Sequence, residues 1–271
     1  MSGGAAADRA RPAGALGAVV VAFGAWVLGL LRELGALAVL FGRIAARIVP
    51  PRFDPRELVL AGERFGWQSA PIVAATAFFT GGIMVMQSLP YVEQLQAMRL
   101  LPWAAAFATF REVGPVLIGL MFSGRVGSNN TAELGTMVVT EQLDALRLLA
   151  IDPLALLIAP RFIAMVVMMT ALTVLGDLCA VIGAALTAKA MADLELFQFM
   201  MLMREQLHVE DLTSGLVKAA FFGAGIALVS CRHGLSASGG AVGVGRAVNA
   251  SVVSSAVGIV LLDWILTGLL G

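Results

Sequence analysis

Five long apolar segments most strongly constrain how this chain of 271 residues can fold. They cover about residues 68–89, 101–124, 162–188, 212–230 and 252–270. Each approaches the roughly 20 residues that a helix needs to cross the hydrocarbon core of a bilayer. A helix also bonds every backbone N–H and C=O within its own segment, which the bilayer core requires. We therefore predict an all-α integral membrane protein with five transmembrane helices.

The overall composition points to the same class of protein. The chain is 59% hydrophobic and 13% charged, whereas soluble domains average about 45–50% apolar and about 25% charged residues. Its formal net charge is zero, which argues against a nucleic-acid partner, because such a partner selects a basic surface. The two cysteines, Cys179 and Cys231, have neither CxxC nor metal-ligand spacing, so we expect them to fill apolar space.

The first 52 residues differ in character from the rest of the chain. Residues 1–12 are small, polar and basic, which predicts a disordered tail. Residues 13–52 are apolar but carry Arg43 and Arg47 in their second half. This pattern is typical of an amphipathic elbow helix in the membrane interface, although the length also allows a membrane span. Residues 53–271 form the predicted transmembrane domain.

The positions of the basic residues predict the orientation of the chain in the membrane. Cytoplasmic loops carry an excess of lysine and arginine. With a cytoplasmic N-terminus, most arginines between the spans lie inside the cell, and only Arg99, Lys189, Arg204 and Lys218 are left outside. The opposite orientation would reverse this bias. We therefore predict that the N-terminus is cytoplasmic.

Arg111 and Glu112 are exceptional because they lie near the middle of the second apolar segment. Ionised side chains at membrane depth are costly and usually face protein, water or a substrate. Pro115 cannot donate a hydrogen bond to the carbonyl of residue 111, and Gly114 weakens the helix further. Two interpretations remain open, a transport site and an ion pair that orients helices. Neighbouring helical residues point about 100° apart, so these two need not pair with each other.

Residues 140–150 read TEQLDALRLLA and predict a short amphipathic helix between the second and third spans. Thr140 is the expected N-cap, with Glu141 at the positive end of the helix. Asp152 is expected to cap a following helix that begins with Pro153. A short helix with an acidic face suits docking into the groove of a partner protein. An ordinary connector in the membrane interface is the alternative.

The chain lacks the motifs of a nucleotide-hydrolysing enzyme. The glycine-rich residues 236–246 contain neither GxxxxGK[ST] nor the GxGxxG order, so they predict a tight turn. We therefore expect no enzyme activity and no cofactor bound by this chain. Asp177 and Asp263 are single carboxylates within the third and fifth spans, for which we favour structural roles. The two histidines have no companions that would complete a metal site, so no metal is expected.

Residues 111–161 read REVGPVLIGLMFSGRVGSNNTAELGTMVVTEQLDALRLLAIDPLALLIAPR. This segment resembles the signature of the MlaE/YrbE permeases, the membrane subunits of Mla-type lipid ABC transporters. The resemblance continues upstream in FGWQSAPIVAATAFFTGGIMVMQ and downstream in VLGDLCAVIGA, SASGGAVGVGRAVNASVV and LLDWILT. It covers about residues 53–270. Asn129-Asn130 departs from the family pattern of small or apolar residues, which places the local helix packing in question.

The resemblance implies a homodimeric permease that moves phospholipids or related lipids between the bacterial inner membrane and the outer envelope. It also implies a separate cytoplasmic ATPase, through which ATP and Mg²⁺ act, an MCE-domain lipid-binding protein, and in some systems a STAS-domain regulator. The family's Arg-Glu pair beside the lipid pathway maps to Arg111 and Glu112. Its coupling element, which meets the ATPase, maps to four residues: Glu141, Gln142, Asp144 and Ala145.

Two other classes of function compete with a lipid permease. An ion- or proton-coupled secondary transporter could use the carboxylates Glu112, Asp177 and Asp263. However, many such transporters are built from internal repeats, and no repeat is visible in this sequence. The other competitor is a non-transporting membrane scaffold. Nucleotide-independent transport would favour the first, and a complex without bound lipid or effect on lipid traffic would favour the second.

Overall fold

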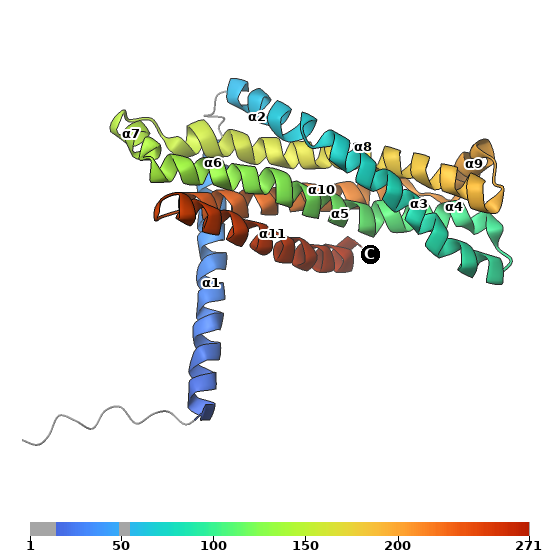
Figure 1. Ribbon diagram of the computed structural model, residues 1–271, viewed down its shortest axis with the longest axis horizontal. Helices are drawn as coiled ribbons and strands as arrows, with labels where there is room; N and C mark the ends of the chain where they lie inside the picture. Colours follow the sequence, from blue (N-terminus) through green and yellow to red (C-terminus); the bar gives the residue numbers. More distant parts are fainter. Residues whose placement is uncertain (1–14, 49–54, 271) are drawn as a thin grey trace, which may run out of the picture.

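The computed structural model describes residues 15–48 and 55–270, in which regular structure is entirely helical. Figure 1 shows a long bundle of helices with one further helix, α1, standing across it. The predicted all-α fold is confirmed. The disordered tail predicted for residues 1–12 lies outside the described residues, as do residues 49–52 of the predicted elbow region.

The α-helices have the following bounds: α1 Ala15–Ile48, α2 Pro55–Trp67, α3 Ala70–Gln94, α4 Leu101–Ala108, α5 Gly114–Phe122, α6 Ser128–Val139, α7 Gln142–Leu148, α8 Ala159–Ala192, α9 Leu196–Gln206, α10 Val209–Leu235 and α11 Gly240–Leu270. Wider π-helical turns lie at Thr109–Val113, Ser123–Gly127 and Leu154–Ile158. A single 3₁₀ turn covers Met98–Leu100. The bundle has two ends, which we call the α7 end and the α9 end after the short helix at each (Figure 1).

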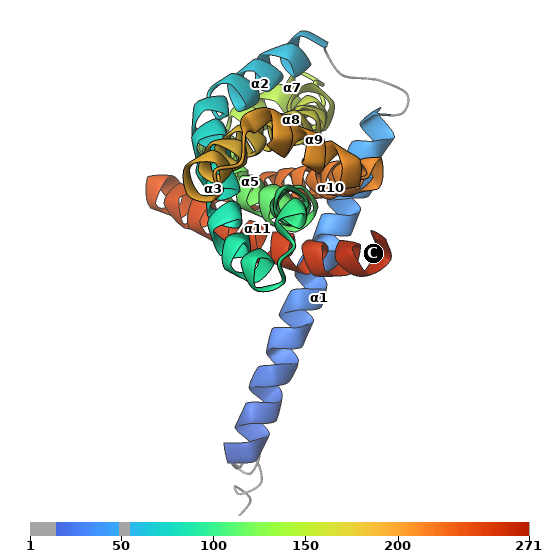
Figure 2. The ribbon, with the colours of Figure 1, turned by 90° about the vertical axis from the view of Figure 1, so that its right-hand side faces the viewer.

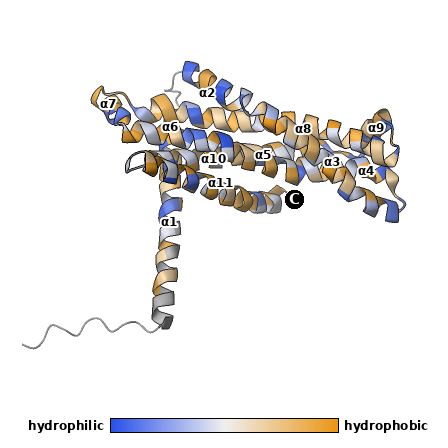
Figure 3. Ribbon diagram, viewed as in Figure 1, coloured by the Kyte–Doolittle hydropathy of each residue, from blue (hydrophilic) through white to orange (hydrophobic). Residues whose placement is uncertain are grey.

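Among the residues that the structure describes, six helical segments are long and apolar enough to cross a membrane, where the sequence predicted five spans. Five of them correspond to the predicted spans and extend beyond most of their predicted limits: Ala70–Gln94, Met98–Val139, Leu154–Ala192, Val209–Leu235 and Gly240–Leu270. The sixth, Val21–Ile48, belongs to α1. Many exposed side chains of the bundle are large and apolar, such as Phe79, Leu178 and Trp264. Hydrophobic residues recur along the long helices of the bundle (Figure 3). Such surfaces suit contact with lipid rather than water.

Helix α1 runs across the long axis of the bundle rather than along it (Figures 1 and 2). Its C-terminal half is anchored, because Leu40 and Ile44 are buried. Two ion pairs add to this contact, from Arg47 to Asp152 at 2.6 Å and from Arg232 to Glu33 at 3.4 Å. In a membrane crossed by the bundle, α1 would lie along the surface. The interfacial helix remains a prediction, and this crossing geometry favours it.

The second span is longer than the sequence suggested, because the polar residues after it are helical. Residues Met98–Val139 form one continuous helical segment of 42 residues, which we call the rod. It contains α4, α5 and α6 and the two π-helical turns between them. The sequence placed the end of the second span near residue 124, whereas Ser128–Val139 continues the same helical segment. Its buried members Asn130 and Thr131 bond to α10 and α11 instead of to water.

Close backbone contact joins α3 to α8. A Cβ atom added to Gly81 would lie 2.0 Å from the carbonyl oxygen of Ala180, and one added to Gly183 would lie 1.9 Å from that of Phe78. Only glycine allows backbones to approach this closely. Lipid provides no hydrophobic force between helices, so tight packing through small residues has to hold them together. The α3–α8 pair is therefore a rigid wall of the bundle.

Replacing Gly183 by alanine should destabilise the folded protein. Overpacking of this kind costs about 1–3 kcal/mol, which exceeds the gain of up to about 1 kcal/mol from the better helix propensity of alanine. The measurement is the apparent melting temperature of the purified chain in detergent. Gly35→Ala is the matched control, because a Cβ there would meet nothing within 4 Å. Equal melting temperatures for Gly183→Ala and the unmodified protein would contradict this close packing.

Candidate functional site

The two charged residues singled out in the second span lie on a π-helical turn of the rod. The turn covers Thr109–Val113, and the N–H of Gly114 donates to the carbonyl of Thr109, five residues earlier. Pro115 follows directly and has no N–H to continue the ordinary helical pattern. The Gly-Pro pair therefore widens the helix locally but does not end it. Turns of this type are frequent at functional sites.

The π-helical turn packs tightly against α10. A Cβ atom added to Gly215 would lie 2.1 Å from the carbonyl oxygen of Phe110. Glycine at this position therefore lets the two backbones approach, and a Cα–H to carbonyl contact of this kind is mildly favourable. The close approach brings Asp211 and Lys218, which lie about one turn before and one turn after Gly215 on α10, beside Arg111 and Glu112.

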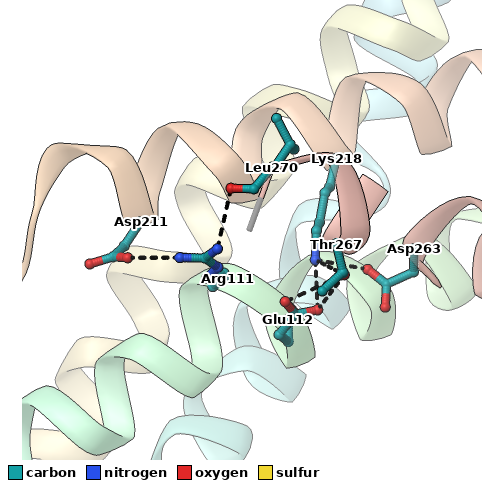
Figure 4. Close-up of polar contacts among 7 residues, drawn as sticks. All are labelled: Arg111, Glu112, Asp211, Lys218, Asp263, Thr267 and Leu270. Carbon is teal, nitrogen blue, oxygen red and sulfur yellow. Dashed lines mark hydrogen bonds and ion pairs between the residues drawn. The ribbon is translucent and has the colours of Figure 1, made fainter. Parts of the chain in front are cut away.

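Glu112 belongs to a polar cluster that joins three helical segments (Figure 4). Lys218 of α10 donates to the Glu112 carboxylate at 2.6 Å and to the Thr267 hydroxyl of α11 at 2.7 Å. Lys218 Nζ also lies 3.2 Å from the carboxylate of Asp263 on α11. The Thr267 hydroxyl in turn lies 3.2 Å from Glu112 Oε2. One ammonium group thus pairs with two carboxylates from different helices.

Arg111 points to the side of the turn nearer the α9 end and has separate partners. Its guanidinium lies 3.6 Å from the carboxylate of Asp211 and donates to the carbonyl oxygen of Leu270 at 3.3 Å (Figure 4). It also covers the ring of Phe107, whose centroid is 5.5 Å away, a cation–π arrangement. Arg111 therefore ties the rod to both α10 and the end of α11.

The cluster has a buried side and an accessible side. The Lys218 side chain is fully buried, whereas the side chains of Glu112 and Arg111 are 35% and 22% exposed. The five charged residues comprise two cations and three carboxylates: Arg111, Lys218, Glu112, Asp211 and Asp263. A charge taken out of water has to be compensated by partners, which Lys218 has. The exposed parts of Arg111 and Glu112 can meet a polar ligand as well as their protein partners.

The structure refines the sequence interpretation of this site in two ways. Arg111 and Glu112 do not pair with each other, as the helical geometry allowed, but each pairs with other helices. Lys218 was counted with the basic residues on the outer side of the membrane although it falls within the predicted span 212–230, and this assignment is wrong, because it lies completely buried within the candidate span Val209–Leu235. The sequence signal was available, since a lysine between apolar residues of one span demands a partner. Asp263 has the structural role that was favoured, as one of those partners.

Helix α7 is shorter than predicted and begins differently. It covers Gln142–Leu148, within the predicted residues 140–150. Thr140 is not the N-cap, because its hydroxyl donates to the carbonyl of Thr136 inside the preceding helix. The chain instead turns at Glu141, which has φ 60° in the left-handed region. This sharp turn, rather than a capping bond, directs α7 away from the rod.

The side chains of α7 fall into a buried face and an exposed face. Leu143 is buried, whereas the proposed coupling residues Glu141, Gln142, Asp144 and Ala145 are exposed. Asp144 pairs with Arg147 at 2.7 Å, with both side chains about two-thirds exposed. Leu148 and Leu149 are also exposed, by 88% and 71%. The α7 end thus presents charged and apolar side chains together, as protein interfaces do.

Asp152 caps the segment after α7 as predicted. Its carboxylate accepts a hydrogen bond from the N–H of Leu154 at 3.0 Å and one from Arg47 at 2.6 Å. Partial burial alone would raise the pKa of Asp152, but these bonds outweigh it and hold the pKa below its usual value. The ionised carboxylate therefore joins α1 to the connection between α7 and α8.

Asn129-Asn130 does not disturb the packing, although the sequence comparison had put this in question. Asn129 is exposed, and Asn130 is fully buried with its amide satisfied. The Asn130 amide nitrogen donates to the Ser230 hydroxyl at 2.9 Å, and its oxygen accepts from Arg161 at 3.0 Å. Buried polar groups are tolerated when they are bonded in this way. Within the described ranges, no group of three or more His, Cys, Asp or Glu residues could hold a metal ion.

An apolar helix bundle with a charged cluster inside it and a short exposed helix at one end is the architecture of a multi-pass membrane protein. Comparison with known proteins specifies the family. The family model described as Permease MlaE matches residues 59–269. The chain therefore belongs to the MlaE permease family, a family of ABC transporter permeases.

Individual relatives share most of their length with this chain. A probable ABC transporter permease protein of Rickettsia felis is 37% identical over 230 residues, covering 84% of this chain and 88% of the relative. The intermembrane phospholipid transport system permease protein MlaE of Haemophilus influenzae is 30% identical and covers 93% and 97%. The chloroplast protein TRIGALACTOSYLDIACYLGLYCEROL 1 of Arabidopsis thaliana is 33% identical and covers 86% and 66%.

Replacing Lys218 by methionine should sharply reduce the yield of folded protein. Two carboxylates would lose their common counter-ion inside the bundle, and stranding a buried charge costs about 3–5 kcal/mol. Combining Lys218→Met with Glu112→Gln should recover part of the yield. Size-exclusion chromatography of detergent extracts measures it, with Lys189→Met, at an exposed ion pair, as the control. Normal yield and stability of Lys218→Met would contradict the structural role of Lys218.

Proposed function

We propose that this chain is the permease subunit of an ABC transporter that moves phospholipids between the bacterial inner membrane and the outer envelope. The observation that carries the proposal is the accessible Arg111–Glu112 side of the cluster, at membrane depth in the rod. A permease for fully apolar molecules would have no use for ionised groups there, since they are costly in lipid. The Haemophilus relative, named as part of an intermembrane phospholipid transport system, supports the same substrate class.

The two residues suit the two charges of a phospholipid headgroup. Arginine offers forked, charged hydrogen bonds to a phosphate, and Arg111 keeps part of its guanidinium accessible beside its contacts with Asp211 at 3.6 Å and with the Leu270 carbonyl at 3.3 Å. Glu112 can receive a headgroup amine while its other contacts hold Lys218. In this proposal the lipid passes along the accessible side of the cluster. Lys218, Asp211 and Asp263 position the two residues.

Transport would be driven by a separate cytoplasmic ATPase that docks on α7. The exposed coupling residues Glu141, Gln142, Asp144 and Ala145 would meet a groove of the ATPase, and ATP with Mg²⁺ would act there rather than on this chain. The Gln142–Leu148 helix follows the rod after the single turn at Glu141, so motion of the ATPase would reach the cluster through the rod. The α7 end is then cytoplasmic, which agrees with the predicted cytoplasmic N-terminus.

The remaining partners follow from membership of the family. We propose a homodimer in the bacterial inner membrane, with the lipid path between the two protomers. An MCE-domain lipid-binding protein would receive or supply lipid at the α9 end, and a STAS-domain regulator could accompany the ATPase. Mass spectrometry of the proteins and lipids that co-purify with the tagged chain in mild detergent tests this set of partners.

Arg111→Ala should lower phospholipid photo-crosslinking to the permease by about tenfold, since a hydrogen bond to a charged group contributes about 1.5–3 kcal/mol. Complex assembly should persist, because the contact of Arg111 with Asp211 is long and partly exposed. Crosslinking with a photoactivatable phospholipid measures the first effect, and ATPase co-purification measures the second.

Arg99→Ala is the matched control for Arg111→Ala, because Arg99 is exposed at the start of the rod. Should Arg111 be purely structural, Arg111→Ala would impair assembly by stranding Asp211, and adding Asp211→Asn would restore it. That pattern, with undiminished lipid crosslinking per assembled complex, would refute the role in lipid handling.

Replacing both Glu141 and Asp144 by lysine should uncouple the permease and leave it folded. Both side chains are exposed on α7, so the bundle loses no buried contact, whereas like charges facing each other across an interface cost several kcal/mol. Recovery of the ATPase in pull-downs from membranes should fall strongly. Glu93→Lys with Glu195→Lys, two exposed sites toward the α9 end, is the control. Undiminished ATPase recovery with normal lipid transport would refute the coupling role of α7.

A further inference from the structure

Asp177 is a buried carboxylate that the proposed transport route does not use. It lies near the middle of α8, within the candidate span Leu154–Ala192, and is only 6% exposed. Its Oδ1 atom has no hydrogen-bond partner in the part of the chain that the structure describes. Most buried polar side-chain atoms in proteins are bonded, so this oxygen requires an explanation.

Asp177 lines a small cavity between α3, the rod and α8. The other polar lining residues are Thr76 and Thr80 of α3 and Thr109 of the rod, and the rest are glycine, alanine, leucine and isoleucine. The cavity has room for about one water molecule. Among the residues that line it, Asp177 is the only titratable one.

Two of the three threonine hydroxyls around the cavity already donate their protons elsewhere. Thr80 donates to the carbonyl of Thr76 at 2.8 Å, and Thr109 donates to that of Ala105 at 2.7 Å. An ionised carboxylate needs several hydrogen-bond donors, whereas the hydroxyl of Thr76 is the one side-chain donor left among the residues that line this cavity.

The two cations of the charged cluster have partners other than Asp177. Arg111 lies between Asp211 and Leu270, and Lys218 lies between Glu112, Asp263 and Thr267. All of these partners belong to the rod, α10 or α11, whereas the Asp177 cavity is lined by α3, α8 and the rod. A water molecule in the cavity could donate one hydrogen bond, but it would not balance a negative charge in an apolar surrounding.

We infer that Asp177 is a proton-binding site, occupied while α3, α8 and the rod are packed as they are here. A neutral carboxylic acid has no charge to compensate and has one O–H to donate to a water molecule in the cavity. The proton also removes the unbalanced charge from the membrane interior. A bound sodium ion is the competing ligand, but it would need several oxygen ligands in a space that holds about one water molecule.

The Asp177 cavity lies next to the π-helical turn that carries Arg111 and Glu112. A Cβ atom on Gly114, the residue directly after that turn, would lie 3.4 Å from Asp177 Oδ1. If the rod moves away from α8 during transport, water enters the cavity and the ionised form becomes favourable. Proton release would then accompany the movement of the cluster. This last step rests on the proposed function, whereas the presence of the bound proton does not.

Infrared spectroscopy of the full-length chain in lipid nanodiscs tests the bound proton directly. We expect a C=O stretching band of a protonated carboxylic acid at neutral pH, which Asp177→Asn removes and Asp177→Glu shifts. Asp193→Asn is the matched control, since Asp193 is an exposed aspartate at the end of the same helix, and it should leave the band unchanged. Spectra of the unmodified chain and Asp177→Asn that are identical in this region would overturn the inference.

Two further measurements test whether sodium binds in place of the proton and whether the bound proton is coupled to transport. If the band appears only when sodium is replaced by N-methylglucamine, Asp177 binds a cation and the proton site is refuted. In the complete transporter with its ATPase, ATP turnover should change several-fold between mildly acidic and mildly alkaline pH, and Asp177→Asn should flatten this profile. Parallel profiles would refute coupling of the proton to transport. A carboxylic-acid band without any ATP-driven activity would instead refute the proposed function alone.

Discussion

The ammonium group of Lys218 holds together the part of the bundle on which the proposed function depends. It is fully buried and contacts Glu112 of the rod and both Asp263 and Thr267 of α11. In a hydrophobic interior, the free-energy cost of an unpaired charge is far greater than the free energy gained by packing. The rod, α10 and α11 therefore have to meet at this point. The position of Arg111 and Glu112 on the accessible side follows from this convergence. The charged cluster therefore both assembles the helices and forms the candidate site.

The sequence was sufficient to predict the class of fold and the general region of the site. Apolar segments of membrane-spanning length give a strong signal, because the bilayer sets their minimum length independently of tertiary contacts. The run from Arg111 to Arg161 was long enough to indicate the family, which the comparisons confirm. The coupling element and the Arg-Glu pair were both located, and their roles remain proposals.

Features that depend on contacts between distant segments could not be predicted in the same way. The residues Ser128–Val139 look like a polar loop, yet they continue the rod because Asn130 and Thr131 bond to residues about 100 positions away. Lys218 was misplaced because its partners Glu112 and Asp263 lie 106 and 45 residues from it along the chain. Thr140 matched a capping pattern, but its hydroxyl bonds to the previous helix. Local patterns cannot decide between such competing partners.

The rod also has a mechanical consequence. From Glu112 to Val139 the chain stays helical without an intervening loop, a distance of about 40 Å at 1.5 Å per residue. A displacement or rotation of α7 would therefore be transmitted along this helix to the cluster with little bending. The two π-helical turns, Thr109–Val113 and Ser123–Gly127, are the points at which the rod would bend most easily. The first of these turns carries Arg111 and Glu112, so the transmitted motion would end at the residues that are proposed to hold a lipid headgroup.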